Sequence, residues 1–267
     1  MPGTSLFPIL ASFWKGGDGC YVNGCDPVCE VPLLSPSSTV TFATSCWEND
    51  WRTILLKPGY LEWLQIGHHC FPFQERLLVI NNVKEVETVQ AAARAKVQQG
   101  ILTRVVVAQD ILGHFQLKRE DWNDWQYYNA LGPLTAIFEA QGKYLLYVTG
   151  DVYLKKPVRW IPQAIRFMQK HPQCKVANLS WNDRYEEVKK ESYSRSWNFA
   201  LSREGFSDQM FLVRTGDFKA PIYGEVREDA SHFPRGDVFE KRVFSTMKNR
   251  GWERITFMWG SYTHENI

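Results

Sequence analysis

Small polar and acidic residues follow each apolar run in the first half of the chain. They are Thr44-Ser45-Cys46, Asn81-Asn82, Gln109-Asp110 and Thr149-Gly150-Asp151. No GxGxxG or Walker motif occurs, and those motifs cradle phosphate on glycine amides, so a dinucleotide dehydrogenase or a phosphate-loop hydrolase is disfavoured. A carboxylate repels a diphosphate unless a hard divalent cation between them takes oxygen ligands from both. Acidic strand ends of this kind would therefore need such a cation if the ligand were a diphosphate.

The apolar runs that precede these residues predict buried strands, because they are apolar throughout and rich in β-branched and aromatic residues. The expected strands cover residues 40–43, 76–80, 105–108, 144–148 and 176–179. Helical patterns lie between them at residues 51–69 (interrupted at Pro58), 86–98 and 133–141. This alternation predicts an α/β fold with a mixed, mainly parallel sheet and helices on both faces. Its ligand site is expected outside the carboxyl ends of the strands.

The two ends of the chain are less regular. Residues 1–38 are rich in Gly, Pro, Ser and Cys, which indicates an irregular arm. In the second half we expect a charged segment at 183–195, a strand at 210–213 and a helix at 238–248. Three clustered cysteines in the arm lack a fourth ligand at zinc-site spacing, so a zinc site is not predicted there.

The composition limits the classes of partner. The chain has 267 residues, a net charge of +2, 44% hydrophobic residues and 22% charged residues. This is the balance of a globular fold, and it disfavours nucleic acid, whose backbone normally needs a marked basic excess. No apolar run approaches the roughly 20 residues that span a membrane, and no signal peptide is evident, so we expect a soluble, cytoplasmic protein. The eleven tryptophans fill cores but also stack on sugars.

Several segments together resemble one family. They are the strand from Val40 to Ala43, Tyr128-Asn129-Ala130-Leu131-Gly132, Tyr147-Val148-Thr149-Gly150-Asp151-Val152, Arg235-Gly236-Asp237-Val238-Phe239-Glu240 and Tyr262-Thr263-His264. In this order they resemble the nucleotide-sugar-dependent glycosyltransferases of the GT-A fold. The resemblance implies a Rossmann-like domain over residues 39–267, with a donor half at about 39–155 and an acceptor half at about 156–267.

The resemblance also implies a metal site for Mn²⁺ or Mg²⁺. Asp151 matches the last aspartate of the family's Asp-x-Asp motif, whereas Thr149 stands where the first aspartate is expected. A hydroxyl is a weaker ligand for a hard cation, so the metal stoichiometry is left open. His264 resembles the C-terminal histidine that completes the metal shell in many relatives. The alternative for Asp151 is capping of the turn before Pro157, and the alternative for His264 is simple exposure to solvent.

The donor side follows from the same resemblance. Thr44 and Asn81 would contact the nucleoside, and Asp110 and Thr149 would also lie in the donor site. Asn129 and Gly132 precede Pro133, which suits the first turn of a helix, so free amide donors near the donor sugar or diphosphate are expected there. Ordinary turn chemistry and a plain loop-to-helix junction remain alternatives for these residues.

The acceptor side contains the predicted base. Asp237, with Glu240 three residues later, reads as a helix N-cap with a reciprocal glutamate, and the family places its catalytic base in this setting. Asp208 is the second candidate for the base. Glu240 and Trp181 are expected in the acceptor site, although core packing also explains Trp181.

These expectations combine into one function. The chain is expected to transfer a hexose or deoxyhexose from a nucleotide diphosphate sugar to a hydroxyl of a glycan, with inversion at the anomeric carbon. The partners are then the sugar nucleotide and a glycan or glycoconjugate, and peripheral contact with a membrane stays open. A non-catalytic carbohydrate-binding protein and a sugar-nucleotide nucleotidyltransferase are the alternatives.

Overall fold

Parallel strands form where the β-branched and aromatic runs of the first half occur. The computed structural model describes residues 39–230 and 238–264. The strands of its first half are β1 (Val40–Cys46), β2 (Glu75–Ile80), β3 (Arg104–Val107) and β4 (Tyr144–Val148). They pair in parallel in the order β3-β2-β1-β4. This part of the predicted sheet is confirmed.

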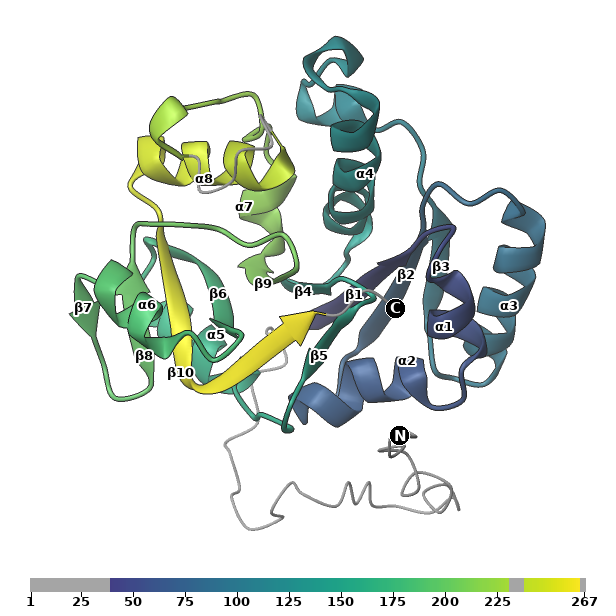
Figure 1. The fold of residues 1–267 in the computed structure, drawn as a ribbon, viewed down its shortest axis with the longest axis horizontal. Coiled ribbons are helices and arrows are strands. Elements are labelled where there is room, and N and C mark those ends of the chain that lie inside the picture. The colour runs from purple at the N-terminus through teal and green to yellow at the C-terminus, as the bar shows by residue number, and fades with distance from the viewer. Residues whose placement is uncertain (1–38, 231–237, 265–267) are drawn as a thin grey trace, which may run out of the picture.

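The second half continues the same sheet to ten strands (Figure 1). Its strands are β5 (Val152–Leu154), β6 (Cys174–Trp181), β7 (Ser194–Arg195), β8 (Phe199–Ser202), β9 (Met210–Arg214) and β10 (Glu253–His264). The order continues β4-β9-β6-β10-β8-β7, and β5 pairs with β10. Because β9 is antiparallel to both β4 and β6, while β10 is parallel to β6, the strands β1–β4, β6 and β10 share one direction. Their carboxyl ends and the amino end of β9 therefore share one edge of the sheet.

Helices cover both faces of the sheet, as predicted. They are α1 (Trp51–Leu56), α2 (Tyr60–Glu62), α3 (Val86–Gln98), α4 (Asp124–Glu139), α5 (Ile161–Lys170), α6 (Tyr185–Glu191), α7 (Thr215–Lys219) and α8 (Phe239–Arg250). Short turns of other helix types span Trp63–Gly67, Leu112–Phe115, Arg119–Asp121 and Glu228–Ala230.

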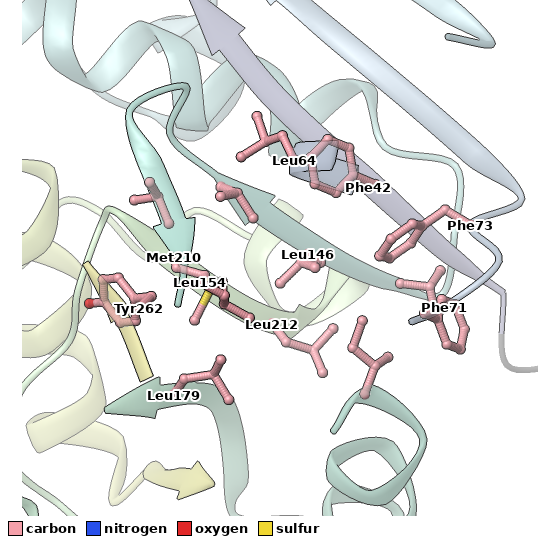
Figure 2. Close-up of a cluster of buried hydrophobic side chains, with 14 of the residues drawn as sticks. Phe42, Leu64, Phe71, Phe73, Leu146, Leu154, Leu179, Met210, Leu212 and Tyr262 are labelled. Atoms are coloured by element: carbon pink, nitrogen blue, oxygen red, sulfur yellow. The ribbon is translucent and has the colours of Figure 1, made fainter. Parts of the chain in front are cut away.

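Two apolar clusters hold these layers together. One face of the sheet packs against α1, α2, α3 and α5, and the other packs against α4, α7 and α8. Figure 2 shows the first cluster, in which Phe42 of β1, Leu146 of β4 and Tyr262 of β10 are all buried. Burial of this kind contributes about 25 cal/mol per Å² of apolar surface. The cluster joins the first strand to the last, so the carboxyl edge is held by both halves of the chain.

One predicted element differs in a way that matters for the site. The helix expected to start at Pro133 starts at Asp124, and Pro133 lies inside it. The reason is a capping box in which the Asn123 side chain accepts from the backbone N–H of Gln126, while the Gln126 side chain accepts from the backbone N–H of Asn123. The prediction of free amide donors around Asn129 and Gly132 is therefore wrong, because both residues lie within a formed helix.

Candidate active site

A cavity of about 280 Å³ lies at the carboxyl ends of β2 and β3, beside the start of α3 and the first half of α4. Its polar lining comes from the strand ends, and two adjacent tyrosines of α4 supply aromatic surface. The lining residues are Ile80, Asn81, Asn82, Val83, Val86, Val107, Ala108, Gln109, Asp110, Tyr127, Tyr128 and Leu131. Apolar and aromatic walls with a few fixed polar groups are typical of sites for small molecules.

Asn81 is the most constrained polar group of this cavity. Its backbone N–H donates to the Cys46 carbonyl at 2.8 Å, and its side-chain Nδ2 donates to the Tyr128 carbonyl at 2.7 Å. Its Oδ1 is buried without a hydrogen-bond partner among the described residues. A buried acceptor without a donor is costly, so this oxygen is suited to accept a hydrogen bond from an N–H group of a ligand. Asp110 also lines the cavity, where one carboxylate oxygen accepts from the Leu112 N–H at 3.1 Å.

Two other residues predicted for the donor site lie elsewhere. Thr44 is fully buried within β1 and does not line the cavity. Asn129 is exposed on α4, and its side chain donates to the Trp125 carbonyl of the same helix. The strand β1 continues to Cys46, so Thr44 is not the strand-end residue that the sequence analysis took it to be. The structure therefore puts neither residue in contact with this cavity.

Gly132 is explained by packing between α4 and the sheet. A Cβ atom added there would lie 2.9 Å from Ser45 Oγ and 3.1 Å from Tyr147 OH. These two hydroxyl groups are themselves hydrogen-bonded at 2.8 Å. The close approach that requires glycine is thus to β1 and β4. Packing of α4 on the sheet therefore accounts for the glycine, and the donor contact of Gly132 stays a prediction.

The acidic strand end after β4 meets the last residue of β10. Asp151 is half-buried and directly precedes β5, and His264 is the register partner of the next residue, Val152. Thr149 donates its backbone N–H to the Gln209 carbonyl at 2.9 Å, and the Gln209 amide nitrogen lies 3.2 Å from His264 Nδ1. The two predicted metal ligands are therefore brought together from distant parts of the sequence.

Two further carboxyl groups face this point. Asp208 lies just before β9, where burial, and then the nearby charge of Asp151, raises its pKa to about 6. Glu240 lies in the first turn of α8, and burial, followed by the charge of Asp208, raises its pKa well above its ordinary value. Arg254 opposes the shift of Glu240. Asp208 is thus mostly ionised near neutral pH, and Glu240 holds its proton more strongly than an ordinary glutamate does.

Sequence reasoning missed Asp50 and Tyr147. Asp50 follows β1, where it accepts a hydrogen bond from the Trp47 N–H at 2.7 Å, and burial raises its pKa to about 7, with a further contribution from Asp151. Burial raises the pKa of Tyr147, and the charges of Asp208, Asp151 and Asp50 raise it further. The Tyr147 phenol therefore lies close enough to three carboxyl groups for their charges to raise its pKa. The sequence signal for Asp50 is the polar and acidic segment that follows Trp47, just beyond the strand end at Cys46.

These residues can hold a cation only in company with a ligand. Among the residues described, no group of three or more His, Cys, Asp or Glu side chains is arranged to hold a metal ion. Asp151 and His264 supply two donors, and the Thr149 hydroxyl beside them is buried and has no hydrogen-bond partner within residues 39–230 and 238–264. Mg²⁺ in phosphate sites is commonly held by one or two carboxylates plus phosphate oxygens and water. The donor set therefore fits a divalent cation that binds together with a diphosphate.

Trp181 is placed beside this group. Its ring centroid lies 6.4 Å from that of His264, with the two rings stacked at 27°, and the Arg184 guanidinium lies 4.3 Å from its ring centroid. Trp181 is half-buried at the end of β6, so its predicted acceptor contact stays a prediction that its position permits. Asp237, predicted as the base, and the arm at residues 1–38 lie outside the described residues.

Comparisons with known proteins give only structural similarities. No family model and no curated protein matches the chain. The crystal structure of GalNAc-T7 with UDP, GalNAc and Mn²⁺ is similar at 12% identity, with a TM-score of 0.48, over 86% of this chain and 44% of that one. The mannosyltransferase PcManGT from Pyrobaculum calidifontis, in complex with GDP-Man and Mn²⁺, is similar at 13% identity, with a TM-score of 0.49, over 84% of this chain and 56% of that one.

A third similar structure is Staphylococcus aureus TarS 1-349, at 16% identity and a TM-score of 0.44, over 85% of this chain and 60% of that one. The chain thus spans 44 to 60% of the length of these three structures. At these TM-scores and identities, the likeness assigns no activity to this chain. In the described parts of the chain, no helix combines the length and hydrophobicity needed to cross a bilayer.

Proposed function

We propose that the chain is a metal-assisted glycosyltransferase, which moves a sugar from a nucleotide diphosphate sugar to a hydroxyl of a glycan. One observation carries the proposal. A single edge of the sheet bears both a polar, aromatic cavity of about 280 Å³ and a set of carboxyl groups with raised pKa values. The cavity suits a nucleoside, and the carboxyl groups suit cation binding and proton transfer.

The donor would lie along this edge. Tyr127 and Tyr128 offer aromatic surface to a base, and Asn81 Oδ1 offers an acceptor to a base N–H. The strands β2, β1 and β4 are consecutive in the sheet, so about 10 Å separates the cavity end from Asp151 at the usual strand spacing. This is a span that a ribose and a diphosphate can cover. The diphosphate would then reach Asp151 and His264.

The metal role follows from the charges of the two partners. Asp151 and His264 would hold Mn²⁺ or Mg²⁺, which when bound neutralises charge on the diphosphate leaving group. Without a cation, the diphosphate would face Asp50, Asp151 and Asp208, three carboxyl groups close enough to shift the pKa of Tyr147. The electrostatics of this chain therefore favour a donor that arrives with its cation.

The transfer step would use the carboxyl pair on the acceptor side. The acceptor hydroxyl oxygen forms a bond to the anomeric carbon, the bond from that carbon to the diphosphate oxygen breaks, and the hydroxyl proton passes to Asp208. A pKa of about 6 leaves Asp208 ionised and close to the operating pH, which suits a general base. Glu240, whose raised pKa favours the protonated form, would donate a hydrogen bond to an acceptor oxygen. A single displacement of this kind inverts the anomeric carbon.

Asp237 remains a second candidate for the base, because it precedes Glu240 by three residues in the sequence. The two candidates are separated by comparing Asp208→Asn with Asp237→Asn under single-turnover conditions. The variant that retains donor binding and loses transfer identifies the base.

A thermal-shift screen tests the function as a whole. UDP, GDP, ADP, CDP and the corresponding triphosphates are added with and without Mn²⁺. We expect one diphosphate to raise Tm only when Mn²⁺ is present, because ligand binding to the native state stabilises it. Asp151→Asn should remove the metal-dependent part, and Leu56→Ala, at an exposed site on α1, should keep it. If no diphosphate stabilises the chain with Mn²⁺, the proposal is wrong, and a response to triphosphates alone would favour a nucleotidyltransferase.

A further inference from the structure

Two tryptophans are exposed at one end of the sheet. The Trp197 side chain in the turn between β7 and β8 is 87% exposed, and that of Trp259 in β10 is 65% exposed. β8 and β10 pair antiparallel with Phe199 opposite Phe257, so the same register places Trp197 opposite Trp259. The Met258 N–H donates to the Asn198 carbonyl at 2.9 Å, as this register requires. The Trp259 Nε1 also lies 3.4 Å from the Trp197 carbonyl, so the two residues are neighbours, and we call them the Trp pair.

The Trp pair continues a buried aromatic row beyond its helix. Phe199 and Phe257 are buried with ring centroids 5.5 Å apart, and Phe199 packs on Phe167 of α5. Trp197 and Trp259 each lie two residues from one of these phenylalanines in the chain, and both are exposed where Phe199 and Phe257 are buried. An exposed apolar patch of this kind marks a binding surface more often than a structural need.

The local structure fixes this exposure. The pairing of β10 with β6 jumps from Phe257–Leu179 to Ser261–Ser180, so residues 258–260 form a bulge. Gly260 allows the bulge to pack, because an added Cβ would lie 2.9 Å from Val158 Cγ1. Bulges re-aim side chains and are frequent next to functional sites. Here the residue on the bulge that is turned into solvent is a tryptophan.

Hydrogen bonds hold the indole of Trp259 at its polar edge. Its Nε1 donates to Asn198 Oδ1 at 3.1 Å and lies 3.4 Å from the Trp197 carbonyl. Asn198 Nδ2 in turn donates to Gln163 Oε1 at 2.7 Å. Because the N–H is already used, the indole presents its apolar ring to a partner. An apolar ring flanked by amide groups matches the C–H face and the hydroxyl rim of a pyranose sugar.

The Trp pair is continuous with the candidate active site along β10. Trp259 precedes His264 by five residues, which at about 3.3 Å per residue is at most about 16 Å. Between them, Asp183 forms an ion pair with Lys155, and its backbone N–H donates to Ser261 Oγ at 2.8 Å. Trp181, stacked on His264, lies at the site end of this path. Aromatic and polar groups thus line the way from the Trp pair to the proposed metal ligands.

We propose that the Trp pair binds the distal sugars of the acceptor, so that the acceptor is an oligosaccharide chain several residues long. The inference rests on the proposed function for the direction of the chain, with its terminal hydroxyl at Asp208. Each indole stacks on a pyranose ring, and Asn198 and Gln163 lie beside the stacked sugar. Binding of the distal sugars lowers the KM for long acceptors without changing the transfer step.

Affinity electrophoresis tests the binding without any need for activity. The full chain is run through native gels that contain soluble β-glucan, α-glucan, mannan, galactan or glycol chitin. We expect at least one polymer to retard it, and we expect Trp197→Ala and Trp259→Ala each to reduce the retardation at least threefold. Trp259→Tyr should restore part of it, because a ring that stacks is retained. Leu56→Ala, which removes an exposed apolar side chain on α1, should leave the retardation unchanged.

Separate measurements distinguish the other outcomes. The Mn²⁺-dependent thermal shift with nucleotide should be unchanged in both alanine variants, because the Trp pair does not bind the donor. Absence of that shift in the native chain would count against the proposed function, and not against sugar binding by the Trp pair. The proposal is overturned if none of the polymers retards the native chain or if the alanine variants are retarded equally. It is also overturned if the Trp pair is instead needed for sedimentation with phosphatidylcholine–phosphatidylserine vesicles or for self-association in analytical ultracentrifugation.

Discussion

The two ends of the site edge differ in the chemistry they offer. The cavity at β2 and β3 is lined by amide, tyrosine and aliphatic groups, and Asp110 is its one carboxylate among the described residues. The end formed by β4, β9, β10 and α8 instead gathers carboxyl groups, two of which, Asp208 and Glu240, have pKa values raised by burial and by neighbouring charge. The first end is suited to binding and the second to reacting. A mutation should therefore affect mainly affinity at one end and mainly turnover at the other.

The largest effect is expected at Asp208. Asp208→Asn should lower transfer by roughly 100-fold to 10,000-fold, the usual contribution of a general base. Glu240→Gln should lower it only a few-fold, because the raised pKa of Glu240 favours the neutral carboxyl group, which a glutamine resembles in size and hydrogen bonding. Single-turnover rates with a saturating donor measure both effects, and donor affinity should stay near that of the native chain.

The pH profile supplies the control for this pair. In the native chain kcat/KM should rise with pH through an apparent pKa near 6, because the base must lose its proton. Glu240→Gln should keep this rise, whereas the residual rate of Asp208→Asn should lack it. Equal losses in the two variants would contradict the division of roles and make the carboxyl pair one unit.

The next largest effect is on stability, and it comes from two buried histidines near the boundary between the donor half and the acceptor half. His68 and His69 are buried there, and His69 Nδ1 accepts from Trp160 Nε1 at 3.2 Å. Burial lowers the pKa of His68 to about 2 and that of His69 to about 3. Below pH 6.5 the unfolded chain binds protons that the native chain excludes. The free energy of unfolding should therefore fall by up to about 1.4 kcal/mol per pH unit for each histidine as the pH drops from 6.5 towards 3.

Urea unfolding at pH 7, 6 and 5 measures this slope. His69→Asn keeps an acceptor for Trp160 and removes one titrating ring. The fall in the free energy of unfolding between pH 6.5 and pH 5 should therefore be smaller by up to about 2 kcal/mol. Replacement of the exposed His114 by Asn is the matched control. An unchanged slope in His69→Asn would show that this ring does not make the fold sensitive to acid.

A smaller loss is expected where α4 packs on the sheet. Gly132→Ala would place a Cβ atom 2.9 Å from Ser45 Oγ, so the hydrogen bond between Ser45 and Tyr147 must shift. Overpacking of this kind costs about 1 to 3 kcal/mol. Thermal unfolding should show the loss, and Gly113→Ala, where an added Cβ meets nothing within 4 Å, is the control. Loss of nucleotide binding without loss of stability would instead return Gly132 to the donor site.

The same contrast explains which parts could be predicted from the sequence. Strands β1 to β4 are formed by continuous apolar runs, so their order of appearance and the polar residues at their ends were readable. The pairing of β10 with β6 and β5 joins residues that are far apart in the sequence and passes through a bulge, and no local pattern encodes it. Asp151 and His264 were therefore proposed from a family resemblance, and only the pairing of β5 with β10 brings them together.

Two predicted element boundaries are wrong because a stronger local signal lies nearby in the sequence. Pro133 suits a first helical turn, yet the capping box at Asn123 and Gln126 starts the helix earlier and includes the proline. Thr44 was read as a strand end because the apolar run stops at Ala43, although the strand continues through Cys46. In both cases hydrogen bonds made by polar residues extend the helix or strand beyond its apolar segment.

The smallest effect, and the most specific one for the cavity, is expected at Asn81. Asn81→Ala removes an unpartnered acceptor from the wall and frees the Tyr128 carbonyl that the amide holds. A hydrogen bond of this kind contributes about 0.5 to 1.5 kcal/mol, so nucleotide affinity should fall roughly 2-fold to 13-fold. Calorimetry with the diphosphate should find the same relative loss with Mn²⁺ and with Mg²⁺, because Asn81 does not touch the cation. A loss that depends on the cation would mean that the nucleoside and metal ends of the site are coupled, and the separation of binding from reacting along this edge would no longer hold.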